Sequence, residues 1–450
     1  MSFVSLLFLV VFLPASVLLA RLIPERFRNT FLLLVSLLFY AWSAGRNLPV
    51  LLGEMVFTYF AARELQRRRA QGDTGTVSFC LLADTVLLAA VLAVYKYSGL
   101  PLPAGISFFT FSALSCLFDV GRGKADAEKN PVSLWLYLAF FPKVLMGPIA
   151  QYADMLPQMD SHPVSAASLE RGTLRFLAGL FKKVLLADAF GDAFRQIHAL
   201  PQMASMTAVL GTVFYGLQLY YDFSGYSDMA IGAASMFGFH LPRNFDHPYT
   251  AGSASDFWRR WHITLGAWFR DYVYIPLGGS RAGKARLVLN LAVVWLLTGI
   301  WHGNTVNFVL WGLWWGIIVI LEKLVLARFL DKLSGVFRCA LVNLAAFSGW
   351  IFFFSPTPGD CLHWWGQIFG AAGAGFWNSQ TTWYLTGNLI LLAAGIAACG
   401  TIPARLVQRI LKCRGRSGVW ILAGLTALLL LLSVARILSS TYQTFLYAAF

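Results

Sequence analysis

Charged residues are scarce in this sequence. They make up 12% of the 450 residues, whereas hydrophobic residues make up 58%. Soluble domains carry about 25% charged residues, so the composition excludes an ordinary soluble protein. A helix needs about 20 residues to cross a hydrocarbon core of about 30 Å. The sequence therefore predicts an all-α polytopic membrane protein, and its most apolar windows lie at residues 4–20, 31–42, 79–95, 287–301, 308–321, 385–399 and 419–434.

The signatures of several common chemistries are missing. No P-loop, Rossmann fingerprint or HExxH motif occurs, and the six cysteines show no CxxC or metal-ligand spacing. Ser224 does not lie in a GxSxG elbow, which argues against a serine hydrolase. We therefore expect no bound cofactor, no metal site and no disulfide framework.

The formal net charge of +14 does not indicate nucleic-acid binding in so apolar a chain. Basic residues gather in short segments at 21–28, 63–69, 182–183 and 405–416, and the positive-inside rule places such loops in the cytoplasm. The first two clusters are separated by two apolar segments, so both can lie inside. We expect roughly 10–12 crossings, with shorter re-entrant or interfacial segments, in a single membrane domain over residues 1–450. The first apolar segment lacks the basic start of a signal peptide and is expected to be a retained helix.

The segment "SDFWRRWHITLGAWFRDYVYIPLGG" (255–279) combines aromatic and basic residues. Ser255 and Asp256 are plausible caps, and Pro276 disfavours further helix. At helical spacing, Arg259 falls outside a stripe that contains His262. The pattern predicts an interfacial or re-entrant helix, in which His262 either packs quietly or faces a buried site. The stripe comprises Trp258, Trp261, His262, Leu265, Phe269 and Tyr272.

The stretch "TGIWHGNTVNFVLWG" (298–312) places a histidine and an asparagine in an apolar run. Sixteen residues separate His302 from Arg286, which is roughly 24 Å of helix. The HGNT step is therefore predicted to break two membrane helices, with Gly303 permitting the bend. An ionisable group at this depth marks a functional site, although a neutral histidine bonded to a neighbouring helix is the structural alternative. A neutral imidazole there can act as a general base.

A third polar cluster lies in "YYDFSGYSDMAIG" (220–232). Asp222 and Asp228 need partners between apolar flanks, and the arginines of segment 255–279 together with Arg243 and Arg281 are candidates. A metal pair is disfavoured because no histidine lies at a ligand spacing.

The combined motifs resemble the membrane-bound O-acyltransferase (MBOAT) family, and in particular its bacterial branch that O-acetylates alginate. The resemblance rests on segments 255–279 and 298–312, and is strongest over residues 95–320. Further matching stretches are "ISFFTFSALSCLFDVGRG" (106–123), "FFPKVLMGPIAQYADMLPQ" (140–158), "GLFKKVLLADAF" (179–190), "YYDFSGYSDMAIG" and "PRNFDHPY" (242–249).

This resemblance implies a ring of helices around a tunnel or funnel in the bacterial inner membrane. It implies transfer of an acyl group, most simply acetyl, from a cytoplasmic thioester such as acetyl-CoA to a hydroxyl on an extracytoplasmic polysaccharide, with a periplasmic acetyltransferase partner protein. The family's catalytic histidine maps onto His302, as base or as transiently acylated group, and its second histidine maps onto His262.

Binding roles are expected for seven further residues, and basic residues such as Lys182, Lys183, Arg281 and Lys284 could attract the phosphates of coenzyme A. Three other interpretations stay open: D-alanyl-type transfer from a carrier protein, a transporter with intramembrane polar residues, and a scaffold of a glycan-export complex. A transporter would more often show two related halves, which this sequence lacks. The expected substrate-binding or donor-binding residues are Trp301, Asn304, Trp258, Trp261, Arg259, Asp222 and Asp228.

Overall fold

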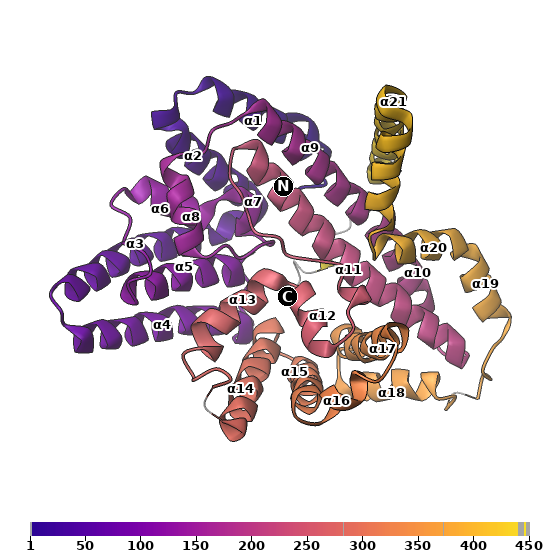
Figure 1. The fold of residues 1–450 in the computed structure, drawn as a ribbon. Helices are drawn as coiled ribbons and strands as arrows, with labels where there is room; N and C mark the ends of the chain where they lie inside the picture. Colours follow the sequence, from indigo (N-terminus) through magenta and orange to yellow (C-terminus); the bar gives the residue numbers. More distant parts are fainter. Residues whose placement is uncertain (1, 282, 372, 440–444, 447–450) are drawn as a thin grey trace.

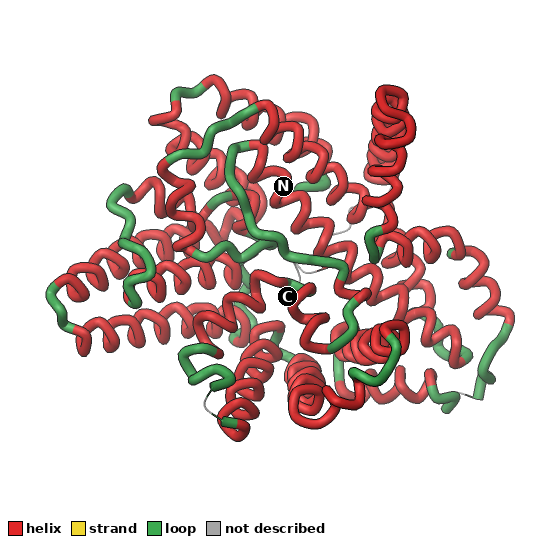
Figure 2. The backbone as a smooth tube through the Cα atoms, in the orientation of Figure 1, coloured by secondary structure: helices red, strands yellow, loops and turns green. Residues whose placement is uncertain are grey.

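A computed structural model describes residues 2–281, 283–371, 373–439 and 445–446. Over these residues the chain is a series of helices joined by short connections, and no strand occurs among them (Figures 1 and 2). The prediction of an all-α polytopic protein is confirmed.

The first half of the chain contributes a group of helices at the edge of the molecule and one long helix, at residues 205–236, that runs through its middle (Figure 1). Short π or 3₁₀ stretches interrupt several of them. In order, the elements are η1 (Phe8–Phe12), α1 (Leu13–Leu22), α2 (Glu25–Ala44), η2 (Gly45–Asn47), α3 (Leu48–Ala70), α4 (Thr74–Tyr97), α5 (Ile106–Gly121), α6 (Pro131–Ala139), α7 (Phe141–Val144), α8 (Tyr152–Asp160), α9 (Ala166–Phe181), η3 (Lys182–Ala187), α10 (Asp188–His198) and α11 (Ser205–Met236).

The second half begins with short helices at the centre of the molecule and continues with longer ones at its edge (Figure 1). These elements are η4 (Pro248–Thr250), α12 (Ala254–Arg260), α13 (Ile263–Phe269), η5 (Arg270–Tyr274), α14 (Lys284–His302), α15 (Val306–Leu321), η6 (Glu322–Leu326), α16 (Ala327–Leu330), α17 (Gly335–Phe354), α18 (Pro358–Ile368), α19 (Ser379–Gly387), α20 (Leu389–Ala398) and α21 (Ile402–Ser439).

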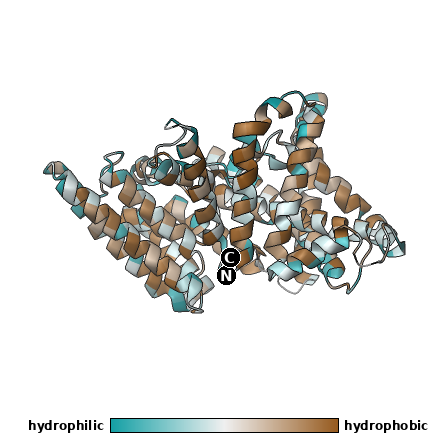
Figure 3. Cartoon of the chain, turned by 90° about the horizontal axis from the view of Figure 1, so that it is seen from below, coloured by the Kyte–Doolittle hydropathy of each residue, from teal (hydrophilic) through white to brown (hydrophobic). Residues whose placement is uncertain are grey.

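Six helical stretches are long and apolar enough to cross a membrane, and a seventh is added if α19 and α20, bent by 58°, form one span. One of the six is residues 25–70, which holds both α2 and α3. The number is below the expected 10–12. Residues Phe8–Leu22 and Ile106–Gly121 are apolar but shorter than 18 residues, and α11 is a long interior helix with polar side chains. In Figure 3, hydrophobic residues (brown) predominate on the long helices, and hydrophilic residues (teal) are most frequent in the loops and at helix ends.

Helix α11 runs through the middle of the molecule and packs against α9 and α10 (Figure 1). Glycines permit the close crossing of α9 and α11: a Cβ on Gly225 would lie 2.8 Å from the carbonyl oxygen of Gly179, and one on Gly232 would lie 2.6 Å from that of Gly172. Small residues at such crossings are typical of membrane helix pairs.

Candidate active site

Helix α14 ends at His302, and α15 begins at Val306. The predicted break at the HGNT step is confirmed, but the reason for its glycine differs from the expected one. Gly303 has an extended backbone (φ 178°), which any residue adopts, so flexibility is not what this position requires. Space is the requirement, because a Cβ there would lie 2.4 Å from the ring of Phe308.

His302 is buried, with 3% of its surface exposed. Aromatic rings surround it: the ring centroids of Trp301, Trp311 and Phe353 lie 4.7, 4.8 and 5.0 Å from that of its imidazole. Such a cage excludes bulk water and fixes the orientation of the imidazole.

Segment 255–279 is not the single helix that its periodicity predicts. The predicted caps, Ser255 and Asp256, were wrong: the helix begins at Ala254, because the N-cap is Ser253, whose hydroxyl accepts from the Asp256 N–H at 3.0 Å. It then breaks at Trp261 and His262 before α13 and η5 continue. His262 adopts a left-handed backbone (φ 44°, ψ 54°), which is uncommon for a non-glycine residue and needs support from its surroundings. The bend turns the buried imidazole toward the interior.

Asn244 supports this bend. Its side-chain Oδ1 lies 3.0 Å from Nδ1 of His262 and also accepts hydrogen bonds from the N–H and the hydroxyl of Thr264, at 3.3 and 2.9 Å. Its backbone carbonyl accepts from the N–H of Ile263 at 2.9 Å. An acceptor with these partners requires Nδ1 of His262 to donate.

The other ring nitrogen of His262, Nε2, is buried without a hydrogen-bond partner among the residues that the structure describes. Burial lowers the pKa of His262 to about 3, so the imidazole is neutral and Nε2 carries a lone pair. His262 can therefore accept a hydrogen bond from a ligand.

Two cavities meet at His302. The first, of about 290 Å³, is lined by both histidines and by Trp258, Arg259 and Trp261. The second, of about 340 Å³, is lined by His302, Gly303, Asn304 and residues at the end of α4. The structure thus brings five predicted residues to the first cavity and adds Asn304 in the second. Trp301 packs beside His302 but lines neither cavity.

The sides of the two cavities follow from the end of α4. The positive-inside rule predicts that the basic turn between α3 and α4 is cytoplasmic, and α4 would then end near the outer face. There Lys96 and Tyr97 donate hydrogen bonds to the carbonyls of Trp301 and Ile300. With that orientation, we expect the His302 end of α14 to face outward, and we name the second cavity the outer cavity and the first the inner cavity.

Lys96 was not predicted as a site residue. Its ammonium group lies 5.2 Å from the centroid of the Trp301 ring and lines the outer cavity with His302. A cation near the carbonyl end of a helix is favourable. No local pattern could reveal it, because its partner lies 205 residues away.

Asp222 and Asp228 lie away from both cavities, and their predicted arginine partners were wrong. Asp222 is ion-paired with the buried Lys183 at 2.7 Å. Asp228 pairs with Arg175 at 3.0 Å and Lys182 at 2.6 Å. Within the described part of the chain, no group of three or more His, Cys, Asp or Glu side chains could hold a metal ion.

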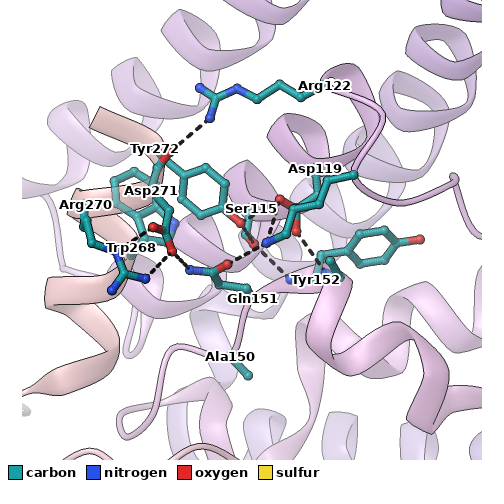
Figure 4. Close-up of polar contacts among 12 residues, drawn as sticks. Ser115, Asp119, Arg122, Ala150, Gln151, Tyr152, Trp268, Arg270, Asp271 and Tyr272 are labelled. Atoms are coloured by element: carbon teal, nitrogen blue, oxygen red, sulfur yellow. Dashed lines mark hydrogen bonds and ion pairs between the residues drawn. The ribbon is translucent and has the colours of Figure 1, made fainter. Parts of the chain in front are cut away.

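A polar network anchors the segment that carries His262 (Figure 4). The hydroxyl of Tyr272 donates to the buried Asp119 at 2.9 Å, and Ser115 lies 2.8 Å from the same hydroxyl. The preceding residue, Asp271, accepts from the side-chain amide of Gln151 at 2.8 Å. These bonds tie η5 to α5 and to the start of α8, and so hold the lining of the inner cavity in place.

Comparison with known proteins gives the class of this molecule. Residues 103–358 match the model of the membrane-bound O-acyltransferase family. The chain belongs to this family and is a multi-pass membrane O-acyltransferase, so the enzyme interpretation is confirmed over the transporter and scaffold interpretations.

The chain is also similar to curated proteins whose names specify an acyl group and an acceptor. The chain is 36% identical to the probable alginate O-acetylase AlgI of Pseudomonas syringae, over 82% of this chain and 75% of that protein. It is 33% identical to the peptidoglycan O-acetyltransferase of Helicobacter pylori, over 66% and 64%. It is 27% identical to the teichoic acid D-alanyltransferase of Bacillus subtilis, over 48% and 57%.

Proposed function

We propose that this enzyme transfers an acetyl group from cytoplasmic acetyl-CoA to a hydroxyl of a polysaccharide on the outer side of the bacterial inner membrane. The observation that carries the proposal is the position of His302, whose imidazole lines both an inner and an outer cavity. Two substrates on opposite sides can therefore approach one side chain. The names of the relatives support a glycan acceptor and favour acetyl as the acyl group.

The inner cavity suits the thioester, and the outer cavity suits the hydroxyl. His302 takes the proton of the attacking hydroxyl while its oxygen forms a bond to the thioester carbonyl carbon. The C–S bond then breaks, and the proton passes from His302 to the departing thiolate, which leaves as free thiol. In the alternative route, the imidazole attacks first and an acetyl-imidazole then reacts with the hydroxyl. Both routes give the same ester and thiol.

His262 and Lys96 have supporting roles in this proposal. Neutral His262 faces the inner cavity with Nε2 available to a hydrogen-bond donor, so it orients the incoming thioester arm. Lys96 holds the carbonyl end of α14 and thereby the backbone of His302. A periplasmic partner protein that carries the acetyl group onward to the glycan is compatible with the outer position of the second cavity.

The test uses purified protein in liposomes with acetyl-labelled coenzyme A. We expect wild-type protein to consume label and His302→Ala to lose about 10²–10⁴-fold in rate, the usual contribution of a general base. His240→Ala, at an exposed histidine, is the matched control and should behave as wild type. Full activity of His302→Ala would contradict the proposal, and failure of the wild type to use coenzyme A would contradict the donor and favour a carrier protein.

A further inference from the structure

The inner cavity has an apolar interior and a basic mouth. Tryptophan, phenylalanine and leucine side chains form its walls, and no Asp or Glu occurs among its lining residues within the described part of the chain. Three cationic side chains, Arg259, Arg270 and Lys323, complete the lining. Arg259 and Arg270 come from α12 and η5 of segment 255–279, and Lys323 comes from η6, which follows much later in the sequence.

Each of these cations has an acidic neighbour that leaves it exposed. Asp256 pairs with Arg259 at 3.4 Å, and the side chain of Arg259 stays 72% exposed. Glu322 accepts hydrogen bonds from the N–H groups of Ala254 and Ser255, the latter at 3.0 Å, and so joins η6 to the start of α12. Lys323, the next residue, is exposed and has no ion pair among the residues that the structure describes. The mouth is therefore a built arrangement of three connected elements.

Arg270 is held firmly. Its Nε and one Nη donate to both oxygens of Asp271, at 2.7 and 2.9 Å, and Asp271 is in turn held by Gln151, which accepts from Lys124 at 2.9 Å (Figure 4). The side chain of Arg270 is still 62% exposed. Its remaining guanidinium nitrogen can bind an anion without losing the internal contacts.

We propose that Arg259, Arg270 and Lys323 bind the phosphate groups of a coenzyme A thioester whose arm enters the inner cavity toward His302. This inference rests on the proposed function and adds the part of the donor that the enzyme recognises. A guanidinium matches a phosphate in a bidentate fashion, and an ammonium adds a point charge. A thioester on a long neutral arm that ends in several phosphates fits an apolar cavity with three cations at its mouth.

The residues differ from those that the sequence suggests for this role. Lys183 is buried in ion pairs with Asp188 and Asp222, and Lys182 pairs with Asp228 in a separate polar cavity. Neither Arg281 nor Lys284 lines the inner cavity.

The test is a donor series on protein in zwitterionic liposomes: acetyl-CoA, its 3′-dephospho form and S-acetylpantetheine, which has no phosphate. We expect the KM of wild type to rise at each loss of phosphate, with kcat changed less. The double variant Arg259→Gln/Arg270→Gln should raise the KM for acetyl-CoA at least tenfold and leave that for S-acetylpantetheine unchanged. Lys323→Gln alone should act in the same direction.

Arg243→Gln is the matched control, since Arg243 lines the separate polar cavity and its loss should leave all three KM values unchanged. Equal KM values for the three donors in wild type, or the same loss for every donor in the double variant, would overturn the inference alone. A loss that occurs only in vesicles with anionic lipid would assign the cations to lipid headgroups and overturn it as well. Absence of turnover with every donor would overturn the proposed coenzyme A donor together with this inference.

Discussion

One asparagine determines the conformation of one histidine. His262 has a backbone that L-residues rarely adopt, and the cost of such a conformation is of order 1–3 kcal/mol. Asn244 offsets it by bonding the imidazole of His262 and both polar groups of Thr264. It also fixes the tautomer, because its Oδ1 can only accept. The chemistry of His262 therefore depends on a residue in a different loop.

We predict that Asn244→Ala lowers the acetyl-transfer rate by about 10²-fold, the effect of a misplacement of about 1 Å in an active site. It should also lower the free energy of unfolding by about 1–3 kcal/mol, because buried polar groups lose their partner. Turnover in liposomes and thermal unfolding in detergent measure the two effects. Asn388→Ala removes a hydrogen bond to the carbonyl of Tyr384 at the C-terminal end of α19, and this variant should retain wild-type turnover. Wild-type turnover of Asn244→Ala would show that the bend at His262 stands without it.

At the scale of single residues, the sequence predicted the features of the site that depend on neighbours in the chain. It did not predict those that depend on contacts made by folding. The burial of His302, the helix break beside it and the burial of His262 follow from spacing and apolar flanks. The roles of Asn244 and Lys96 do not, because each acts on a residue that folding brings near. "PRNFDHPY" already marked the segment with Asn244, yet nothing in it distinguishes Asn244 from a loop residue. The ion pairs of Asp222 and Asp228 were missed for the same reason.

The hydrophobic pattern of the sequence predicted the long apolar helices correctly. It did not predict the boundaries of the short helices at the centre of the molecule. The pattern of segment 255–279 is continuous, so it predicts one helix, whereas the bend at Trp261 and His262 arises from bonds to Asn244. The α14–α15 hairpin was predictable because two apolar runs flank a polar step. Its tight packing depends on glycines: a Cβ on Gly299 would lie 2.5 Å from the carbonyl oxygen of Phe308.

The crossing of α9 and α11 gives a prediction about helix packing. A Val side chain at Gly225 would collide with the backbone of α9, since even a Cβ lies 2.8 Å from the carbonyl oxygen of Gly179. We expect Gly225→Val to lower stability by about 1–3 kcal/mol, the usual cost of overpacking. Thermal unfolding of the purified protein measures it. Gly53→Ala in α3, where the added Cβ meets nothing within 4 Å, should not lower the melting temperature. Equal stability of Gly225→Val and wild type would mean that the helices separate without cost.

At the scale of the whole molecule, the fold places short bent helices at the centre and long apolar helices around them (Figure 1). Hydropathy predicted the membrane class correctly, and the orientation inferred from the basic loops stays a prediction. The meeting of two cavities at one histidine could not be predicted, because it requires α4, α12, α14 and α15 to assemble around His302. The proposed function makes this orientation central, because the thioester would enter from the basic face and the hydroxyl from the other.

The most direct measurement of this asymmetry uses vesicles in which all enzyme molecules have the same orientation. Acetyl-labelled coenzyme A is supplied only at the face that carries Arg270, and a polysaccharide acceptor is enclosed on the opposite side. The acceptor is alginate or peptidoglycan fragments, with any partner protein enclosed beside it. We predict that label appears on the enclosed acceptor with wild type and not with His302→Ala. Label on the acceptor only when both substrates share one face would contradict transfer across the membrane at His302.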